Sequence, residues 1–412
     1  MAEPLAQAVA AEAQTPAPVA TTTAATAEPV ATTTTTTAAA AATTAEPTAA
    51  QLHPVEEQEH QIIVDEVSIS AWVEGQEAHT MPERDFNNDA LADFDDEAFD
   101  SGSSAGGSAF TSITSSVLRG EVAEGGRTYA VYGKEEYGLP MDDTELNRLD
   151  MSHAKYYGLI EKKRFLAPIG DSPQKILDLG CGTGIWCIDV ADEYPSAEVI
   201  GVDIAPTQPE WVPPNCRFEL DDMEEPWMWS KNSFDLIFLR DLIYCIRDWP
   251  KLIDQCYTHV KPGGWVEFQG ITAILGSDDN TVPPGGALEQ FTENLIVSSR
   301  MFGTPIDDPI RWKGWFEERG FVDINLKIFK LPINTWPKDT RMKVLGAWEM
   351  ENLLSGMEVM TMRVFVKALG WTEEEVLVFL VNVRKEVKDR GIHAWWPYYV
   401  ITARRPEEGE TA

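Results

Sequence analysis

Three glycines within five residues place the tightest constraint on this chain. They belong to the stretch KILDLGCGTGIW at residues 175–186 and are Gly180, Gly182 and Gly184. Residues 175–179 before them form an apolar run that predicts a buried strand, and residues 185–194 carry apolar side chains at helical spacing. The glycines therefore occupy a strand-to-helix turn, which is where α/β folds bind ligands. Glycine reaches positive φ there and lacks the Cβ that would block a ligand.

The spacing of the glycines distinguishes between the classes of ligand that such a turn can bind. A dinucleotide fingerprint reads G-x-G-x-x-G, and a Walker phosphate loop ends in G-K-[ST]. Here G-x-G-x-G runs into Ile185 and Trp186 without a lysine, so neither phosphate motif fits. A turn whose glycines are purely structural remains the alternative.

Acidic residues end the next two predicted strands. Residues 199–202 are apolar and lead to Asp203, which follows Gly180 at nearly the distance of the ribose-binding carboxylate in dinucleotide folds. The third strand, CRFELDD, ends in Asp221 and Asp222, with Met223 next. Capping or solvation would also explain such carboxylates, and acidic pairs at loop starts are common.

Two further strands complete a series. Residues 234–239 are apolar and precede Arg240 and Asp241, while residues 265–269 follow a Pro-Gly-Gly turn. Helical segments separate all five strands. This alternation predicts an α/β fold with a doubly wound, mostly parallel sheet.

The motif DLGCGTG resembles the first motif of class I S-adenosylmethionine-dependent methyltransferases. Upstream and downstream segments resemble the fungal LaeA-like subfamily; they are RTYAVYGKEEYGLP, the run to LAPI, DDMEEPW, RDLIYCIRDWP and WWPYYVITARRP. The resemblance covers about residues 125–406. It implies a seven-stranded, mostly parallel, Rossmann-like sheet and S-adenosyl-L-methionine as cofactor.

The resemblance also implies which residues hold that cofactor. Asp178 would reach the methionine ammonium directly or through water, the glycine turn with Cys181 would admit the methionyl tail, and Asp203 with Ile204 would take the ribose. The adenine would meet the second acidic tip; its residues are Asp221, Asp222 and Met223. Arg240 would meet the cofactor carboxylate or order the acceptor loop, and a structural ion pair with Asp241 or Asp248 is the equal alternative.

No residue is predicted as catalytic. The candidates for the acceptor side of the pocket are Tyr132, His153, Tyr157 and Tyr244. A lone tyrosine is more often a core or rim residue. Methyl transfer depends largely on aligning two reactants, so a base is not required for much of the rate gain.

The last third of the chain predicts a helical lid and the completion of the sheet. Helices are expected at residues 287–301 and 312–319, and a sixth strand at 322–331. Helical segments at about 338–369 and 373–389 precede a last strand at 396–403, which the resemblance places antiparallel beside the fifth. Several methionines lie between the sixth and the last predicted strand and would suit an adaptable pocket lining, although core packing is the favoured interpretation. They are Met342, Met350, Met357, Met360 and Met362.

Composition divides the chain into three parts. Residues 1–110 hold 19 acidic and one basic residue and begin with an Ala/Thr/Pro tract, so they are predicted to be a disordered tail. Residues 61–73 and the acidic, Phe-containing run at 85–100 suit a partner-binding segment, with a solubilising tail as the alternative. Residues 111–406 form the expected methyltransferase domain with helical lid insertions, and residues 407–412 a short acidic disordered tail.

Charge, hydropathy and cysteine content exclude several classes of ligand and location. The net charge of −34 opposes direct nucleic-acid binding, and the best basic patch, Lys162 to Arg164, is expected to be a solvated helix face. No segment is apolar enough for a membrane span or a signal peptide, which predicts an intracellular protein of nucleus or cytoplasm. The five cysteines form no C-x-x-C pair and suit reduced core thiols, and no metal site is expected.

Two functions remain open from the sequence. The first is a LaeA-like regulator of secondary metabolism and development that acts through protein partners, with the acidic tail as their binding segment. The second is a methyltransferase for a small natural-product intermediate. The acceptor atom and the oligomeric state are not encoded in any motif.

Overall fold

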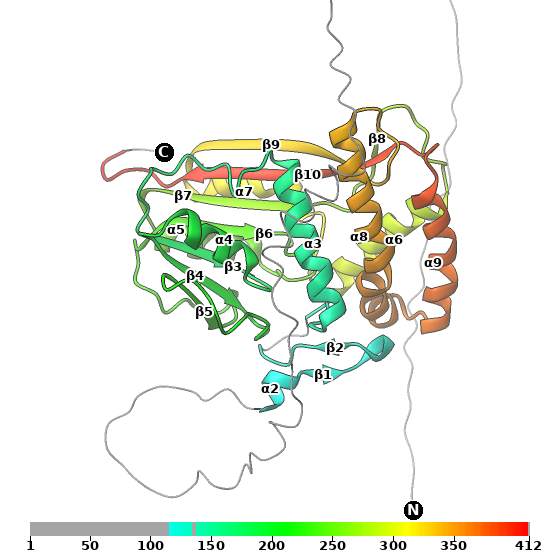
Figure 1. Cartoon of the computed structure of the whole chain (residues 1–412), viewed down its shortest axis with the longest axis horizontal. Helices are drawn as coiled ribbons and strands as arrows, with labels where there is room; N and C mark the ends of the chain where they lie inside the picture. The colour runs from blue at the N-terminus through cyan, green and yellow to red at the C-terminus, as the bar shows by residue number, and fades with distance from the viewer. Residues whose placement is uncertain (1–114, 134–136, 411–412) are drawn as a thin grey trace, which may run out of the picture. The chain divides into compact units, whose positions relative to one another are not determined.

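The structure, a computed structural model, describes residues 115–133 and 137–410 (Figure 1). The predicted disordered tail of residues 1–110 lies outside the described residues. The C-terminal acidic segment is described as far as Glu410, whose carboxylate forms an ion pair with Arg404 at 2.9 Å. The described part is an α/β fold with one large sheet and helices on both of its faces.

Five parallel strands form the first part of the sheet, in the order β5-β4-β3-β6-β7. They are β3 (Lys175–Leu179), β4 (Glu198–Asp203), β5 (Cys216–Leu220), β6 (Phe234–Arg240) and β7 (Val260–Ile271). The side chains of Ile176 and Leu177 point to opposite faces of the sheet and both are fully buried. Burial on both faces explains the continuous apolar runs and confirms the predicted doubly wound fold.

The remaining strands are antiparallel. β10 (Ala394–Arg404) lies between β7 and β9 (Val322–Pro332) and pairs antiparallel with both, as predicted for the last strand. A two-residue strand, β8 (Gly276–Ser277), also pairs with β10 and was not predicted. The Pro-Gly-Gly sequence is not a turn before the fifth strand, because β7 continues through it with an irregular register.

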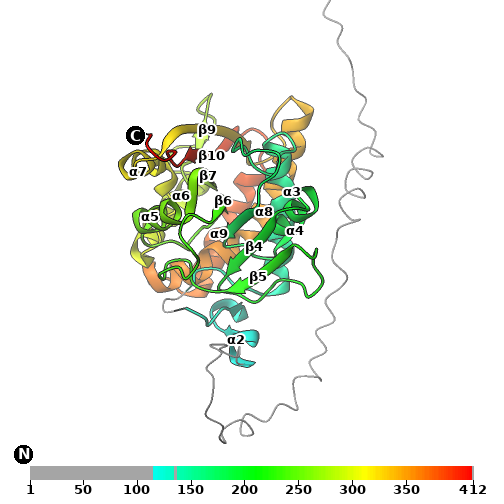
Figure 2. The same ribbon diagram turned by 90° about the vertical axis from the view of Figure 1, so that its left-hand side faces the viewer.

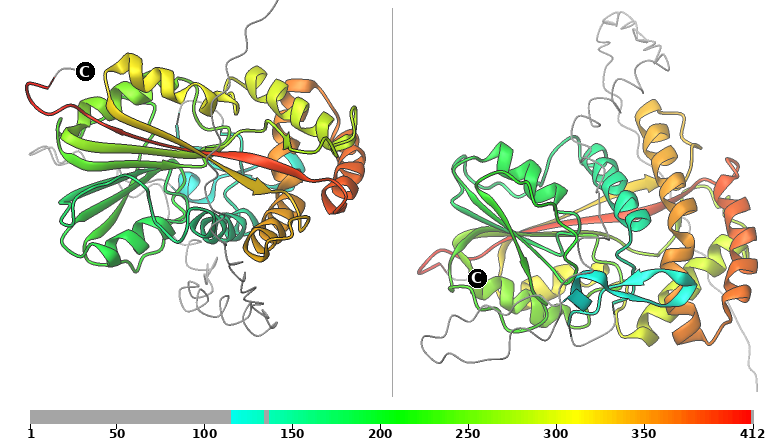
Figure 3. Two further views of the ribbon diagram at one scale, coloured as in Figure 1. Left: turned by 90° about the horizontal axis from the view of Figure 1, so that it is seen from above. Right: turned by 60° about the horizontal axis from the view of Figure 1, so that its bottom comes forward.

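Helices cover both faces of the sheet (Figure 3). α4 (Ile185–Glu193) packs on one face through Trp186, whose ring stacks on Phe238 with 3.9 Å between centroids. α5 (Trp249–His259) and α7 (Trp312–Arg319) pack on the other face. A short hairpin segment precedes this domain; its elements are α2 (Ser115–Arg119), β1 (Glu121–Val122), η1 (Glu124–Gly126) and β2 (Thr128–Tyr129).

A group of helices lies beside the sheet (Figures 1 and 2). Its members are α3 (Asp143–Leu159), α6 (Ala287–Phe302), α8 (Thr340–Val364), the π-helix η3 (Phe365–Leu369) and α9 (Glu373–Lys388), with the 3-10 turn η2 (Asp308–Ile310) after α6. α9 begins with a capping box of Thr372 and Glu375. No helix in the described ranges has both the length and the apolar character needed to cross a membrane.

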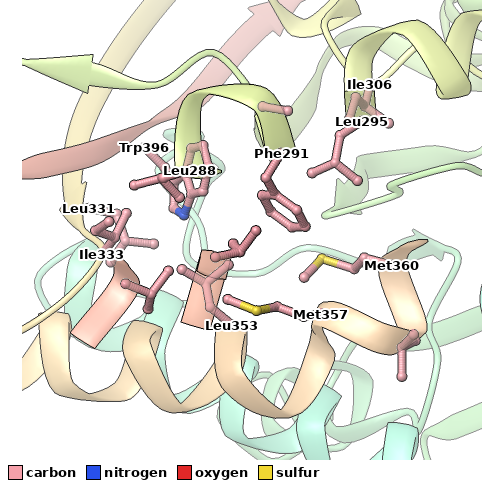
Figure 4. Close-up of a cluster of buried hydrophobic side chains, with 14 of the residues drawn as sticks. Leu288, Phe291, Leu295, Ile306, Leu331, Ile333, Leu353, Met357, Met360 and Trp396 are labelled. Carbon is pink, nitrogen blue, oxygen red and sulfur yellow. The ribbon is translucent and has the colours of Figure 1, made fainter. Parts of the chain in front are cut away.

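The methionines of α8 mainly pack. Met357, Met360 and Met362 are buried in one hydrophobic cluster with residues of α6, α9 and β10. Figure 4 shows Met357 and Met360 beside Phe291 of α6. The preferred packing interpretation therefore fits these three, although Met360 also lines a cavity described below. The prediction for the basic patch was wrong in one respect, since Lys162 and Lys163 are exposed in the turn after α3 rather than on a helix face.

Buried charged groups join α3 to α8. The Lys155 ammonium, fully buried, donates to the Glu349 carboxylate at 2.6 Å. About two turns earlier in α3, Arg148 donates to Glu145 and to the Asn352 side chain, the latter at 2.6 Å. Each charge is matched by a partner, which offsets the cost of removing both from water.

We expect Lys155→Met to destabilise the protein by about 3 to 5 kcal/mol, because Glu349 would remain buried without its cation. The double variant Lys155→Met/Glu349→Met should lose much less, since no buried charge is left unpaired. Urea unfolding followed by circular dichroism measures both. Equal losses for the single and the double variant would contradict this explanation.

Candidate cofactor site

A cavity of about 140 Å³ opens at the carboxyl ends of β3, β4 and β6. Eight of the predicted cofactor residues line it: Gly180, Cys181, Gly182, Asp203, Ile204, Asp222, Met223 and Arg240. The other three, Asp178, Gly184 and Asp221, are not lining residues. Most of the residues singled out from sequence patterns are thus brought to one place by the sheet.

The three glycines of the turn have different surroundings although all have positive φ. A Cβ on Gly180 would collide with Leu242, and one on Gly184 would collide with the Phe218 ring. A Cβ on Gly182 would have Leu149 at 3.8 Å as its nearest neighbour. Gly184 is therefore required for packing of α4 on the sheet, while a Cβ on Gly182 would make only an ordinary van der Waals contact.

Asp203 connects the turn to the neighbouring strand. Its carboxylate accepts from the Gly182 N–H at 2.7 Å and from the Ala205 N–H at 2.9 Å. Burial raises the pKa of Asp203, and hydrogen bonds from backbone N–H groups oppose that shift. Asp203 lines the cavity, and its carboxylate oxygens have acceptor capacity beyond these two hydrogen bonds.

The second acidic tip forms a tight turn after β5. The Asp222 N–H donates to Asp221 at 2.9 Å, and the Glu224 N–H donates to Asp222 at 3.0 Å. Asp221 thus supports the turn from outside the cavity. Met223 is buried, and its carbonyl accepts from the Trp227 indole N–H at 2.9 Å.

Asp178 lies behind the cavity wall on the α4 face of the sheet. Its side chain is buried and accepts from the Cys187 thiol at 3.2 Å. Burial raises the pKa of Asp178 to about 7.

A chain of hydrogen-bonded and ion-paired side chains positions Arg240. Its guanidinium donates to His153 Nδ1 at 2.9 Å, and His153 Nε2 lies 3.0 Å from Asp189, which also pairs with Arg164 at 2.5 Å. Burial lowers the pKa of His153 to about 4, so the ring is neutral with its proton on Nε2. Within the described ranges, Arg240 forms no ion pair with Asp241 or Asp248.

Sequence reasoning missed part of the cavity wall. Asp241 was considered only as a partner for Arg240, yet it lines the cavity, and its place directly after the β6 strand was a usable signal. Arg148, Ser152 and Met360 also line the cavity without any local motif. Of the acceptor-side candidates, His153 lines this cavity, whereas Tyr132, Tyr157 and Tyr244 do not.

Comparison with known proteins identifies the family of the chain. Residues 151–326 match a family model described as a methyltransferase domain. The chain is 40% identical to methyltransferase pytC of Aspergillus terreus, over 73% of this chain and 92% of the relative. It is 36% identical to the secondary metabolism regulator LAE1 of Cochliobolus heterostrophus, over 69% of this chain and 95% of that protein.

The chain is also similar to a solved structure, phosphoethanolamine N-methyltransferase 2 of Haemonchus contortus in complex with S-adenosyl-L-methionine. The two are 18% identical, the match covers 65% of this chain and 59% of that one, and the TM-score is 0.38. The fold and the relatives together define an S-adenosylmethionine-dependent methyltransferase. The chain belongs to the LaeA-like family of these enzymes.

The raised pKa of Asp178 predicts a pH-dependent stability. The ordinary pKa is about 4, so the folded state binds this proton more tightly, and its contribution to stability falls by about 1.4 kcal/mol per pH unit between about 4 and 7. Asp178→Asn should therefore gain about 2 to 4 kcal/mol relative to the wild type between pH 5 and pH 8.

Urea unfolding of the ligand-free protein at the two pH values measures this gain. The comparison of variant with wild type cancels the contribution of Glu267, whose pKa burial also raises to about 7. A difference that does not change with pH would show that Asp178 is ionised throughout.

Proposed function

We propose that this cavity holds S-adenosylmethionine and positions its methyl group for transfer. The observation that carries the proposal is that Asp203, hydrogen-bonded to Gly182 across two neighbouring strands, lines the same cavity as Asp222 and Arg240. When bound, the cofactor supplies a methyl group on a sulfonium. The chain itself supplies alignment, which is worth about 7 to 11 kcal/mol when two reactants are well positioned.

The chemistry of the lining residues fits each part of this cofactor. Asp203 offers acceptor oxygens to ribose hydroxyls, and Asp222 offers them to the adenine amino group, with Met223 beside the ring. Arg240, which has a neutral histidine as its hydrogen-bond partner, offers a cation to the carboxylate. Asp178 lies behind the wall, so we propose that it reaches the ammonium through a water molecule.

Asp203→Ala should weaken S-adenosylmethionine binding by about 1.5 to 3 kcal/mol, because buried hydroxyl groups would lose their acceptor. Isothermal titration calorimetry measures the loss. Glu210→Ala is the matched control, since this carboxylate is exposed beyond β4 and does not line the cavity. Unchanged affinity in Asp203→Ala would refute the ribose assignment.

We further propose that the protein regulates secondary metabolism and development through protein partners, as a nuclear LaeA-like protein. Relatives named secondary metabolism regulators support this role; the Aspergillus flavus laeA protein is 33% identical over 69% of this chain. The composition of residues 61–73 and 85–100 suits recognition segments for such partners. A second candidate, methylation of a small natural-product intermediate, is supported by the relative pytC and by a second cavity described below.

Deletion of residues 1–110 should abolish partner capture and leave S-adenosylmethionine affinity unchanged, because no cavity residue is removed. Cross-linking in fungal extract followed by mass spectrometry measures capture. Deletion of residues 1–55 is the control, since it removes the Ala/Thr/Pro tract and keeps the acidic segment. If the longer deletion captures the same proteins as the full chain, the tail is not the binding segment.

A further inference from the structure

A second cavity, of about 50 Å³, adjoins the proposed cofactor site. The two cavities share five lining residues: Arg148, Tyr156, Asp241, Ile243 and Met360. Such a volume exceeds the roughly 10 to 15 Å³ that one water molecule needs, so it accommodates a group of a few heavy atoms. A molecule held there would adjoin the cavity that we propose for the cofactor.

Most of the wall of this second cavity is apolar. Phe291 and Leu295 extend from α6 toward the part of α8 that carries Met357 and Met360 (Figure 4). Further largely apolar lining residues are Ile243, Tyr244, Ile271, Ala273, Ile306, Leu353 and Trp396, so the acceptor-side candidate Tyr244 lines this second cavity. This wall favours a compact hydrophobic molecule.

Asp241 provides an unused polar group between the two cavities. One oxygen of its carboxylate, Oδ2, accepts from the Tyr156 hydroxyl at 2.7 Å. The other oxygen, Oδ1, is buried and has no hydrogen-bond partner among residues 115–133 and 137–410. A buried acceptor left unpaired costs about 1 to 3 kcal/mol, which a bound donor would recover.

The backbone around Asp241 is strained. Asp241 has a φ of 55° and Tyr244 a φ of 60°, in the left-handed region that side chains rarely adopt. Strain of this kind persists only where surrounding contacts enforce it, and it is concentrated at functional sites. The loop after β6 therefore holds the Asp241 carboxylate in a defined position.

The other charged side chains of the second cavity are already paired. Arg148 is paired with Glu145, and Glu349, which also lines this cavity, is paired with Lys155. Asp241 is therefore the carboxylate with an oxygen left for a bound donor. A hydroxyl group suits it, because a hydroxyl oxygen is a weak nucleophile until a neighbouring base takes its proton.

We infer that the second cavity is the methyl-acceptor site and that Asp241 accepts the proton of a hydroxyl group on a compact apolar molecule. As the hydroxyl oxygen bonds to the methyl carbon, its proton passes to Asp241 Oδ1. The carbon–sulfur bond breaks, its electron pair stays on sulfur, and a methyl ether and S-adenosylhomocysteine result. This inference rests on the proposed cofactor site and on the small-molecule candidate function.

The test uses the full-length chain, S-adenosylmethionine with a tritiated methyl group and, as the acceptor probe, an ethyl acetate extract of a fungal culture. The variants are Asp241→Asn, Ala273→Leu, which fills the cavity without removing a polar group, and Asp278→Asn, an exposed-carboxylate control. Calorimetry with S-adenosylmethionine and circular dichroism accompany each assay.

We expect wild type and Asp278→Asn to label a neutral product that stays in the organic phase on acid washing. Asp241→Asn should lower the rate about 100-fold or more, the scale for removing a general base, with unchanged cofactor affinity. Ala273→Leu should also lose transfer with unchanged affinity, which keeps the test decisive if Asp241→Asn does not fold.

Three results would overturn the inference. The first is a labelled amine that moves into the acid phase on washing. The second is label that is confined to protein or absent altogether. The third is methyl transfer at the wild-type rate by Asp241→Asn and Ala273→Leu. A wild-type protein that does not bind S-adenosylmethionine would instead refute the proposed cofactor site itself, so the two failures are distinguishable.

Discussion

The hydrogen bond from the Gly182 N–H to the Asp203 carboxylate, 2.7 Å long, is the contact on which the cavity depends. It joins the turn after β3 to the tip of β4, two strands whose carboxyl ends lie at the same edge of the sheet. The turn can approach Asp203 because Gly182 adopts a positive φ without a side chain. A single contact thus shapes the backbone and orients a carboxylate toward the cavity.

The opposite wall of the cavity depends on buried charges between helices that are far apart in the chain. Arg148 of α3 donates to Asn352 of α8 across 204 residues, and Lys155 pairs with Glu349 nearby. These groups hold α3 against α8 only while all partners are present. The same helices contribute Tyr156 and Met360 to both cavities, so the stability of this helix pair and the shape of the site are linked.

The pattern of apolar runs was sufficient to predict most elements of the fold. The helix at Trp312–Arg319 and the last strand are found as predicted, because each has a local period and clear breakers. The antiparallel direction of that strand, also found, was implied by the family resemblance and not by the apolar pattern. The predicted turn at the Pro-Gly-Gly segment was wrong, since β7 continues through it with Gly263 at positive φ. The predicted helix face at Lys162 and Lys163 was wrong as well, because α3 ends before them.

The sequence by itself determined the fold class, the glycine turn and the acidic strand tips, because these depend on short-range periodicity and on the backbone freedom of glycine. Only the tertiary structure decided that Gly182 faces the cavity while Gly184 packs on Phe218. It also decided that Arg240 bonds to His153, 87 residues away, and that one oxygen of Asp241 is left unpaired. Contacts between distant segments set these features, and no local pattern records such contacts.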